Sequence, residues 1–146
     1  MPMPTITKET TLDVPPATVY SLLTDFGQAT SWVTGMKECR QVTPGAFGVG
    51  TKAEQVKMQM GRPTPVEVTV AKVDPMKEIR LVAVPQGRPP ANVTWTLAPA
   101  GTGTRVTETI SFELPGLMKL MTPMVKGQVS KDMDSDFASM KKKLNG

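Results

Sequence analysis

Two glutamates are the side chains whose positions best suit acid–base chemistry. Glu108 alternates with Val106 and Ile110, so it shares one face of a predicted strand with apolar neighbours. A carboxyl group on such a face would be desolvated, which raises its pKa and allows it to act as an acid, a base or a ligand anchor. Glu54 lies on the same predicted face as Val56 and Met58 and is a second, less regular example.

Each of these candidates has an alternative interpretation. A frayed or bulged strand would leave Glu108 at the rim of the sheet, or its carboxylate would pair with an arginine such as Arg80 or Arg40. Tyr20 is a third candidate, because its phenol could form a hydrogen bond with a substrate, or it could cover the edge of a helix. The catalytic candidates are therefore Glu108, Glu54 and Tyr20.

Several kinds of chemistry are excluded because the chain lacks the residue types that they need. It has no histidine, which removes the commonest general base and the commonest metal ligand. Cys39 is the single cysteine, and it is more typical of a small apolar residue than of a nucleophile. The segment Gly48-Val49-Gly50-Thr51 is too short for a phosphate-binding loop and is typical of a turn. We therefore expect no metal and no cofactor.

Methionine is unusually frequent, with 11 in 146 residues. Its flexible, polarizable side chain suits a surface that adapts to varied apolar ligands, although it also fills irregular gaps in a core. Tryptophan likewise occurs both in cores and in pockets. The side chains that we expect to bind a ligand are Trp32, Met58, Met60, Trp95, Glu108, Phe112, Met121, Val125, Val129 and Met133.

The elements that must position these side chains follow from the spacing of apolar residues and turns. Segments rich in Val, Thr and Ile are separated by short turns that contain Gly and Pro, a pattern that predicts an antiparallel meander. The predicted strands cover residues 5–14, 36–42, 51–60, 66–73, 78–84, 91–97 and 104–114.

Helices are predicted at both ends of this meander. Pro15-Pro16 stops the first strand and starts a short helix that ends near Asp25, which can cap a second helix over residues 26–33. After a short turn at residues 117–121, a long helix covers residues 123–144. Its apolar face has helical spacing and consists of Val125, Val129, Met133, Phe137, Met140 and Leu144. A curved sheet around this helix would leave a cavity between them.

This order of elements resembles the START-like (helix-grip) superfamily, and more narrowly its polyketide cyclase/dehydrase branch, the SRPBCC proteins. The match is carried by residues 14–25 with Trp32, and by Gly48–Thr51, Trp95–Leu97 and Gly103–Thr107. The resemblance covers essentially the whole chain, 1–146, as one domain. It implies an α+β helix-grip fold, with a seven-stranded curved antiparallel sheet around a long C-terminal helix and two short helices between the first two strands. Because this fold hosts lipid carriers, hydrophobe binders, cyclases, quinone-binding proteins and chaperone co-activators, it leaves the function open.

Composition and charge narrow the class of protein. With 39% apolar and 21% charged residues, the chain has the composition of a folded domain. It has no apolar run near the ~20 residues that a membrane span needs, and residues 1–5 lack the features of a signal peptide. The single cysteine fits a reducing compartment, so we expect a cytoplasmic protein. The net charge of +4 includes Lys141-Lys142-Lys143, which complements a helix C-terminus, so we expect no nucleic-acid partner.

Three functions fit these observations. The first is binding of a small hydrophobic or amphipathic molecule, such as a lipid, a quinone or an aromatic polyketide-like compound, in the cavity. The second is a polyketide cyclase/dehydrase-type enzyme, in which Glu108 or Glu54 is the base and Tyr20 or an inward arginine is the donor. The third is a chaperone co-activator-like interaction module, which predicts an exposed apolar patch. The sequence predicts no oligomeric state.

Overall fold

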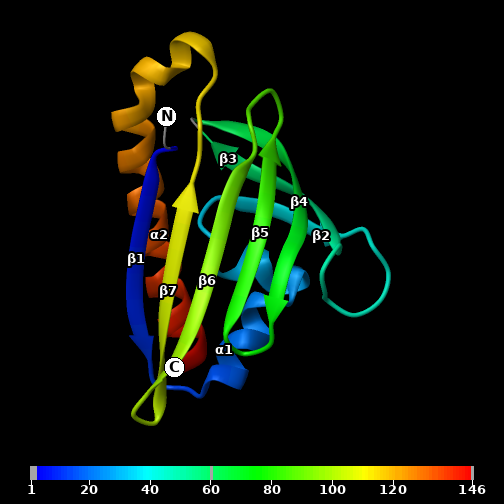
Figure 1. Cartoon of the computed structure of the whole chain (residues 1–146), viewed down its shortest axis with the longest axis vertical. Helices are drawn as coiled ribbons and strands as arrows, with labels where there is room; N and C mark the ends of the chain where they lie inside the picture. Colours follow the sequence, from blue (N-terminus) through cyan, green and yellow to red (C-terminus); the bar gives the residue numbers. More distant parts are fainter. Residues whose placement is uncertain (1–2, 60, 146) are drawn as a thin grey trace.

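The strands form one antiparallel sheet in the order β1-β7-β6-β5-β4-β3-β2 (Figure 1). The computed structural model describes residues 3–59 and 61–145. Within these residues the strands are β1 (Thr5–Leu12), β2 (Met36–Gln41), β3 (Lys52–Gln59), β4 (Arg62–Asp74), β5 (Glu78–Pro85), β6 (Ala91–Ala100) and β7 (Gly103–Ser111). The helical segments are α1 (Pro16–Leu23), the 3-10 helices η1 (Phe26–Ser31) and η2 (Gly116–Met121), and α2 (Thr122–Asn145).

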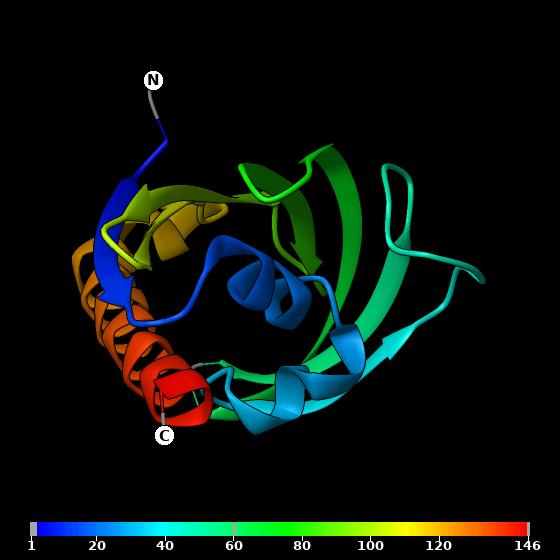
Figure 2. The same ribbon diagram turned by 90° about the horizontal axis from the view of Figure 1, so that it is seen from below.

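The sheet is strongly curved, and α2 lies along one side of it (Figure 2). Pairing shifts register between Val70 and Lys72 in β4 and between Met36 and Glu38 in β2. Such bulges bend a strand and increase its twist. α2 packs against β1, and α1 packs against β6 and β7. The predicted architecture, a seven-stranded curved antiparallel sheet with a long C-terminal helix, is confirmed.

The two short helices between β1 and β2 begin where the sequence predicts. Pro16 occupies the first position of α1, where its missing N–H costs no hydrogen bond. Asp25 caps η1, because its Oδ1 accepts a hydrogen bond from the Gly27 N–H at 3.0 Å. The second segment is a 3-10 helix and ends at Ser31, two residues before the predicted end.

β4 starts earlier than predicted, at Arg62 instead of residue 66. Two prolines, Pro63 and Pro65, stand in these added positions. Here β4 pairs with β3 only, since its pairing with β5 begins at Val66. A strand with one neighbour tolerates residues that lack an N–H, so the prolines do not end β4.

The β6–β7 hairpin also differs from the prediction at both ends. Its strands extend further toward the turn than predicted, and at the opposite end β7 is shorter. β6 continues to Ala100, which pairs with Gly103 across the turn. β7 stops at Ser111, where its partner β1 begins at Thr5. Gly103 is required in this hairpin, because a Cβ there would collide with the carbonyl oxygen of Leu12.

The apolar face of α2 packs onto the rest of the fold as predicted. Val125, Met133, Phe137 and Met140 are buried, and Phe137 belongs to the main core cluster with residues of α1 and the sheet. In the described part of the chain, no helix is both long and apolar enough to cross a bilayer.

Candidate ligand-binding cavity

A cavity of about 840 Å³ lies between the sheet and α2. Every strand from β2 to β7 contributes to its wall, as do α1, both 3-10 helices and the first four turns of α2. The lining is mainly apolar. All of the predicted ligand-binding side chains that the structure describes line it, namely Trp32, Met58, Trp95, Glu108, Phe112, Met121, Val125, Val129 and Met133. Met60, the remaining prediction, lies outside the described residues.

The two tryptophans and Glu108 form a connected group in the cavity wall. Trp95 and Glu108 are cross-strand partners in β6 and β7, and the indole Nε1 of Trp95 donates a hydrogen bond to Glu108 Oε2 at 2.7 Å. The ring of Trp32 is tilted against that of Trp95, with 6.1 Å between their centroids. Trp32 Nε1 is buried and has no hydrogen-bond partner among the described residues.

Glu108 is a buried carboxyl group, with 5% of its surface exposed. Burial raises the pKa of Glu108 to about 7, and the negative charge of Asp136 acts in the same direction. The hydrogen bond from Trp95 and the positive charge of Lys57 oppose these effects. Near neutral pH the carboxyl group of Glu108 can therefore donate a proton or accept one.

Asp136 is a second buried carboxyl group in the same cavity, and it is not among the residues predicted from the sequence. Its Oδ1 accepts a hydrogen bond from the backbone N–H of Thr34 at 2.6 Å. Burial raises the pKa of Asp136, although the hydrogen bond from Thr34 and the charge of Lys57 act against this shift. A signal is present in the sequence, because Asp136 lies three residues after Met133 and four before Met140 on the buried face of α2.

Glu54, another predicted base, does not reach the cavity. It shares a face with Val56 as expected, but at these two positions this is the outer face of the sheet, whereas Met58 at the end of β3 lines the cavity. There its Oε2 pairs with Nη2 of Arg40 at 2.7 Å, and both side chains are largely exposed. The neighbouring Ala53 is buried and Gln55 lines the cavity, so alternation directs Glu54 outward. The predicted inward position of Glu54 is therefore corrected.

Tyr20 also lies outside the cavity lining. It is half-buried and packs against the main core cluster, which agrees with its alternative role as cover for a helix edge. Cys39 is half-buried as well, and burial raises the pKa of its thiol. A raised pKa disfavours the thiolate, which is the nucleophilic form.

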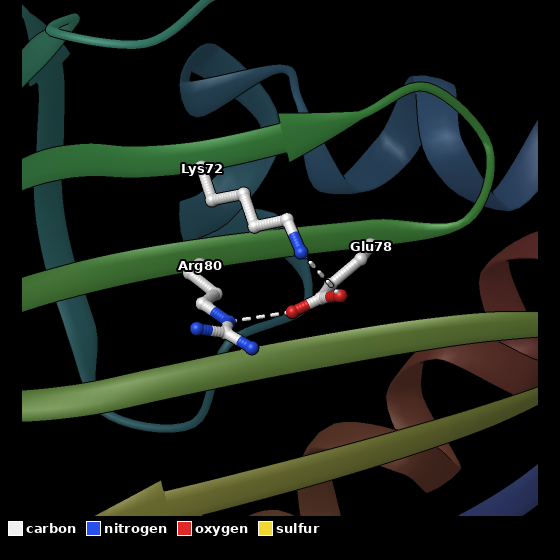
Figure 3. A network of polar contacts seen from close by, with 3 residues as sticks. All are labelled: Lys72, Glu78 and Arg80. Carbon is white, nitrogen blue, oxygen red and sulfur yellow. Dashed lines mark hydrogen bonds and ion pairs between the residues drawn. The ribbon is translucent and has the colours of Figure 1, made fainter.

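The arginines considered as partners of Glu108 pair elsewhere. Arg80 lies on the outer face of β5, where Arg80 and Lys72 hold the carboxylate of Glu78 at 2.5 Å and 3.1 Å (Figure 3). Hydrogen bonds from Lys72 and Arg80 lower the pKa of Glu78. Arg40 pairs with Glu54 on the outer face, as described above. Glu108 thus faces the cavity with neither arginine as its partner, and its burial excludes the rim position.

The carboxyl groups of the cavity do not form a metal site. Residues 3–59 and 61–145 contain no group of three or more His, Cys, Asp or Glu side chains that could hold a metal ion.

The fold agrees with the comparisons to known proteins. Residues 3–145 match the family described as polyketide cyclase / dehydrase and lipid transport, and the chain belongs to this family. A comparison with proteins of curated function gives no match.

Three solved structures illustrate the shared fold. A protein of Thermus thermophilus has a TM-score of 0.81 at 21% identity, with 97% of each chain covered. A START superfamily protein of Mycobacterium smegmatis has a TM-score of 0.81 at 14% identity, again with 97% of each chain covered. The Zhui aromatase/cyclase of a Streptomyces species has a TM-score of 0.83 at 12% identity, over 98% of this chain and 94% of that one. At these identities the likeness establishes the START-like, helix-grip fold.

Proposed function

We propose that the chain binds a small hydrophobic or amphipathic molecule in the cavity between the sheet and α2. The observation that carries this proposal is the cavity itself. Its volume of about 840 Å³ lies within the ~300–1,000 Å³ that is typical of pockets for small molecules. Its mainly apolar lining suits a lipid tail, a quinone or an aromatic polyketide-like ring. The family description, which includes lipid transport, agrees with this proposal.

The polar groups of the cavity favour a ligand that carries at least one oxygen. When protonated, Glu108 can donate a hydrogen bond to a ligand carbonyl, and when ionised it can accept one from a hydroxyl. Because its pKa is about 7, both forms exist near neutral pH. An amphipathic ligand would place its polar end beside Glu108 and Asp136 and its apolar part along the methionines and valines of α2.

Intrinsic fluorescence tests this proposal directly. The chain has two tryptophans, Trp32 and Trp95, and both line the cavity. Saturable titration with a fatty acid, a quinone or a polyketide-like aromatic compound is therefore expected to change the tryptophan emission. Val129→Phe should fill part of the cavity and weaken binding, whereas Val49→Phe, in the exposed loop after β2, should leave it unchanged.

A second experiment identifies the natural ligand. The protein is purified gently from its native host and analysed by denaturing mass spectrometry. Repeated recovery without any apolar molecule, together with no saturable uptake of the three compound classes, would contradict the proposal.

A cyclase/dehydrase-type reaction is the second candidate, and the pair of buried carboxyl groups favours it. Such a reaction needs a base that removes a proton from carbon next to a carbonyl, and a donor that stabilises the resulting enolate. Glu108 would be the base, strengthened by the negative charge of Asp136, which raises the pKa of Glu108. The buried Nε1 of Trp32, which has no partner among the described residues, would be the donor. If Glu108→Gln and Asp136→Asn both turn over every accepted poly-carbonyl substrate at the original rate, this candidate fails.

A further inference from the structure

An exposed apolar patch lies at one end of the molecule, beside the cavity. Leu117, Leu120 and Met124, which we call the mouth patch, are 87%, 82% and 60% exposed. η2, which carries both leucines, has no buried residue among its six. Met124 also lines the cavity, so the cavity reaches the surface at the mouth patch. Figure 1 shows η2 and the start of α2 at the top of the molecule, beyond the end of β7.

The segments at the same end carry basic residues. In the antiparallel sheet this end holds the start of β4, the loop between β5 and β6, and η2 with the first turns of α2 (Figure 1). The basic residues of these segments are Arg62, Arg88, Lys119 and Lys126. Arg88 lines the cavity. Lys119 lies 3.8 Å from Glu113 in an exposed pair, which offsets part of its charge.

The shape and the charge of this end favour one kind of partner. A stable protein interface covers about 800 Å² on each partner, which is far more than three side chains on a protruding turn can supply. A lipid surface, in contrast, accepts a small convex tip, because apolar side chains enter the boundary between headgroups and acyl chains. Nearby lysines and arginines are then attracted to anionic headgroups.

We propose that the mouth patch docks the protein onto an anionic membrane surface. Leu117, Leu120 and Met124 enter the interface, and the surrounding cations contact the headgroups. This proposal concerns the surface and is independent of what the cavity holds. One consequence does rest on the proposed function: a docked cavity that opens at Met124 would exchange an apolar ligand with the membrane without exposing it to water.

Vesicle co-sedimentation of the full chain tests the docking. We expect binding to phosphatidylcholine vesicles that contain phosphatidylserine, weaker binding to phosphatidylcholine alone, and weaker binding as salt is raised. Leu120→Asp should reduce partitioning about tenfold, since it removes an inserted apolar side chain. Lys126→Ala should reduce it about fivefold, the effect of one cation near an anionic surface.

Matched controls make each result interpretable. Val49→Asp changes another exposed apolar residue, in the distant loop after β2, and Lys142→Ala removes a cation from the far end of α2. Both should bind vesicles as the original protein does. Leu120 is exposed, so thermal unfolding of Leu120→Asp should match that of the original chain.

Several outcomes would overturn the proposal. One is no binding to anionic vesicles, and another is equal binding to neutral and anionic ones. A third is an equal loss of vesicle binding in the Val49→Asp and Leu120→Asp variants. Self-association in sedimentation velocity that Leu120→Asp abolishes, without vesicle binding, would assign the patch to a second copy of the chain. Val129→Phe separates the two proposals, because it should lose ligand uptake and keep vesicle binding.

Discussion

The indole Nε1 of Trp95 and the carboxyl group of Glu108 are joined by a 2.7 Å hydrogen bond across the β6–β7 pair. Both residues belong to the wall of the cavity. The bond fixes one carboxyl oxygen, and it stabilises the ionised form of a group that burial would otherwise keep protonated. The proton affinity of Glu108 therefore depends on Trp95 as well as on the surrounding apolar residues.

Stability is expected to fall as the pH rises from about 4 to about 7. The unfolded chain ionises Glu108 at about pH 4.3, while the folded chain keeps the proton until about pH 7. Over this interval the unfolded state is stabilised relative to the folded one. Between pH 5 and pH 8 the free energy of unfolding falls by roughly 2–3 kcal/mol. The raised pKa of Asp136 acts in the same direction.

Glu108→Gln should remove the part of this pH dependence that belongs to Glu108. The amide keeps an oxygen that can accept the hydrogen bond from Trp95, but it does not ionise. Denaturant unfolding at pH 5 and pH 8 measures the effect. An identical fall in stability in the variant and the original protein would show that Glu108 is not the group responsible.

Trp95→Phe should raise the pKa of Glu108 further. The substitution removes the hydrogen bond that favours the carboxylate, while the phenyl ring keeps the site apolar. NMR titration of the Glu108 side-chain carboxyl carbon would follow the change. A pKa that falls or stays the same would contradict the role assigned to the bond.

Phe137→Ala should lower the melting temperature by several degrees or more. Phe137 is buried between α2 and the main core, and truncation of a buried phenylalanine costs roughly 3–5 kcal/mol. Lys142→Ala, on the exposed side of the same helix, is the control and should leave the melting temperature nearly unchanged. Equal, small shifts in both variants would mean that α2 does not close over the sheet.

Gly103→Ala and Gly127→Ala should change stability in opposite directions. A Cβ at Gly103 collides with the carbonyl oxygen of Leu12, so the strands must move and the free energy of unfolding falls by roughly 1–3 kcal/mol. Gly127 lies in α2 with open space around it, and alanine there should stabilise the helix by about 1 kcal/mol. Chemical denaturation of both variants measures the contrast, and destabilisation of similar size in both would refute it.

The sequence predicts the fold better than it predicts the site. Helical spacing identifies the buried face of α2, and alternation places Glu108 inward, because both periods continue over several turns or residues. Alternation also groups Glu54 with Val56, but a period of two does not say which face of a curved sheet is concave. Asp136 is not predicted, because the buried face of α2 is identified from the spacing of apolar residues and a charged residue does not fit that pattern. Its carboxylate is bound by the N–H of Thr34, which is 102 residues away in the chain.

The position of β1 in the sheet has a consequence for synthesis. β1 pairs with β7, and Thr5 lies opposite Ser111, so the first strand has no partner until residues 103–111 have left the ribosome. At ordinary rates of translation this interval is roughly 5–20 s. During that time the apolar inner face of the growing sheet also lacks α2, which follows every strand in the chain. The cavity is therefore completed only after α2 has emerged, and until then the apolar inner face of the nascent sheet is exposed to aggregation, because its distant contacts form slowly.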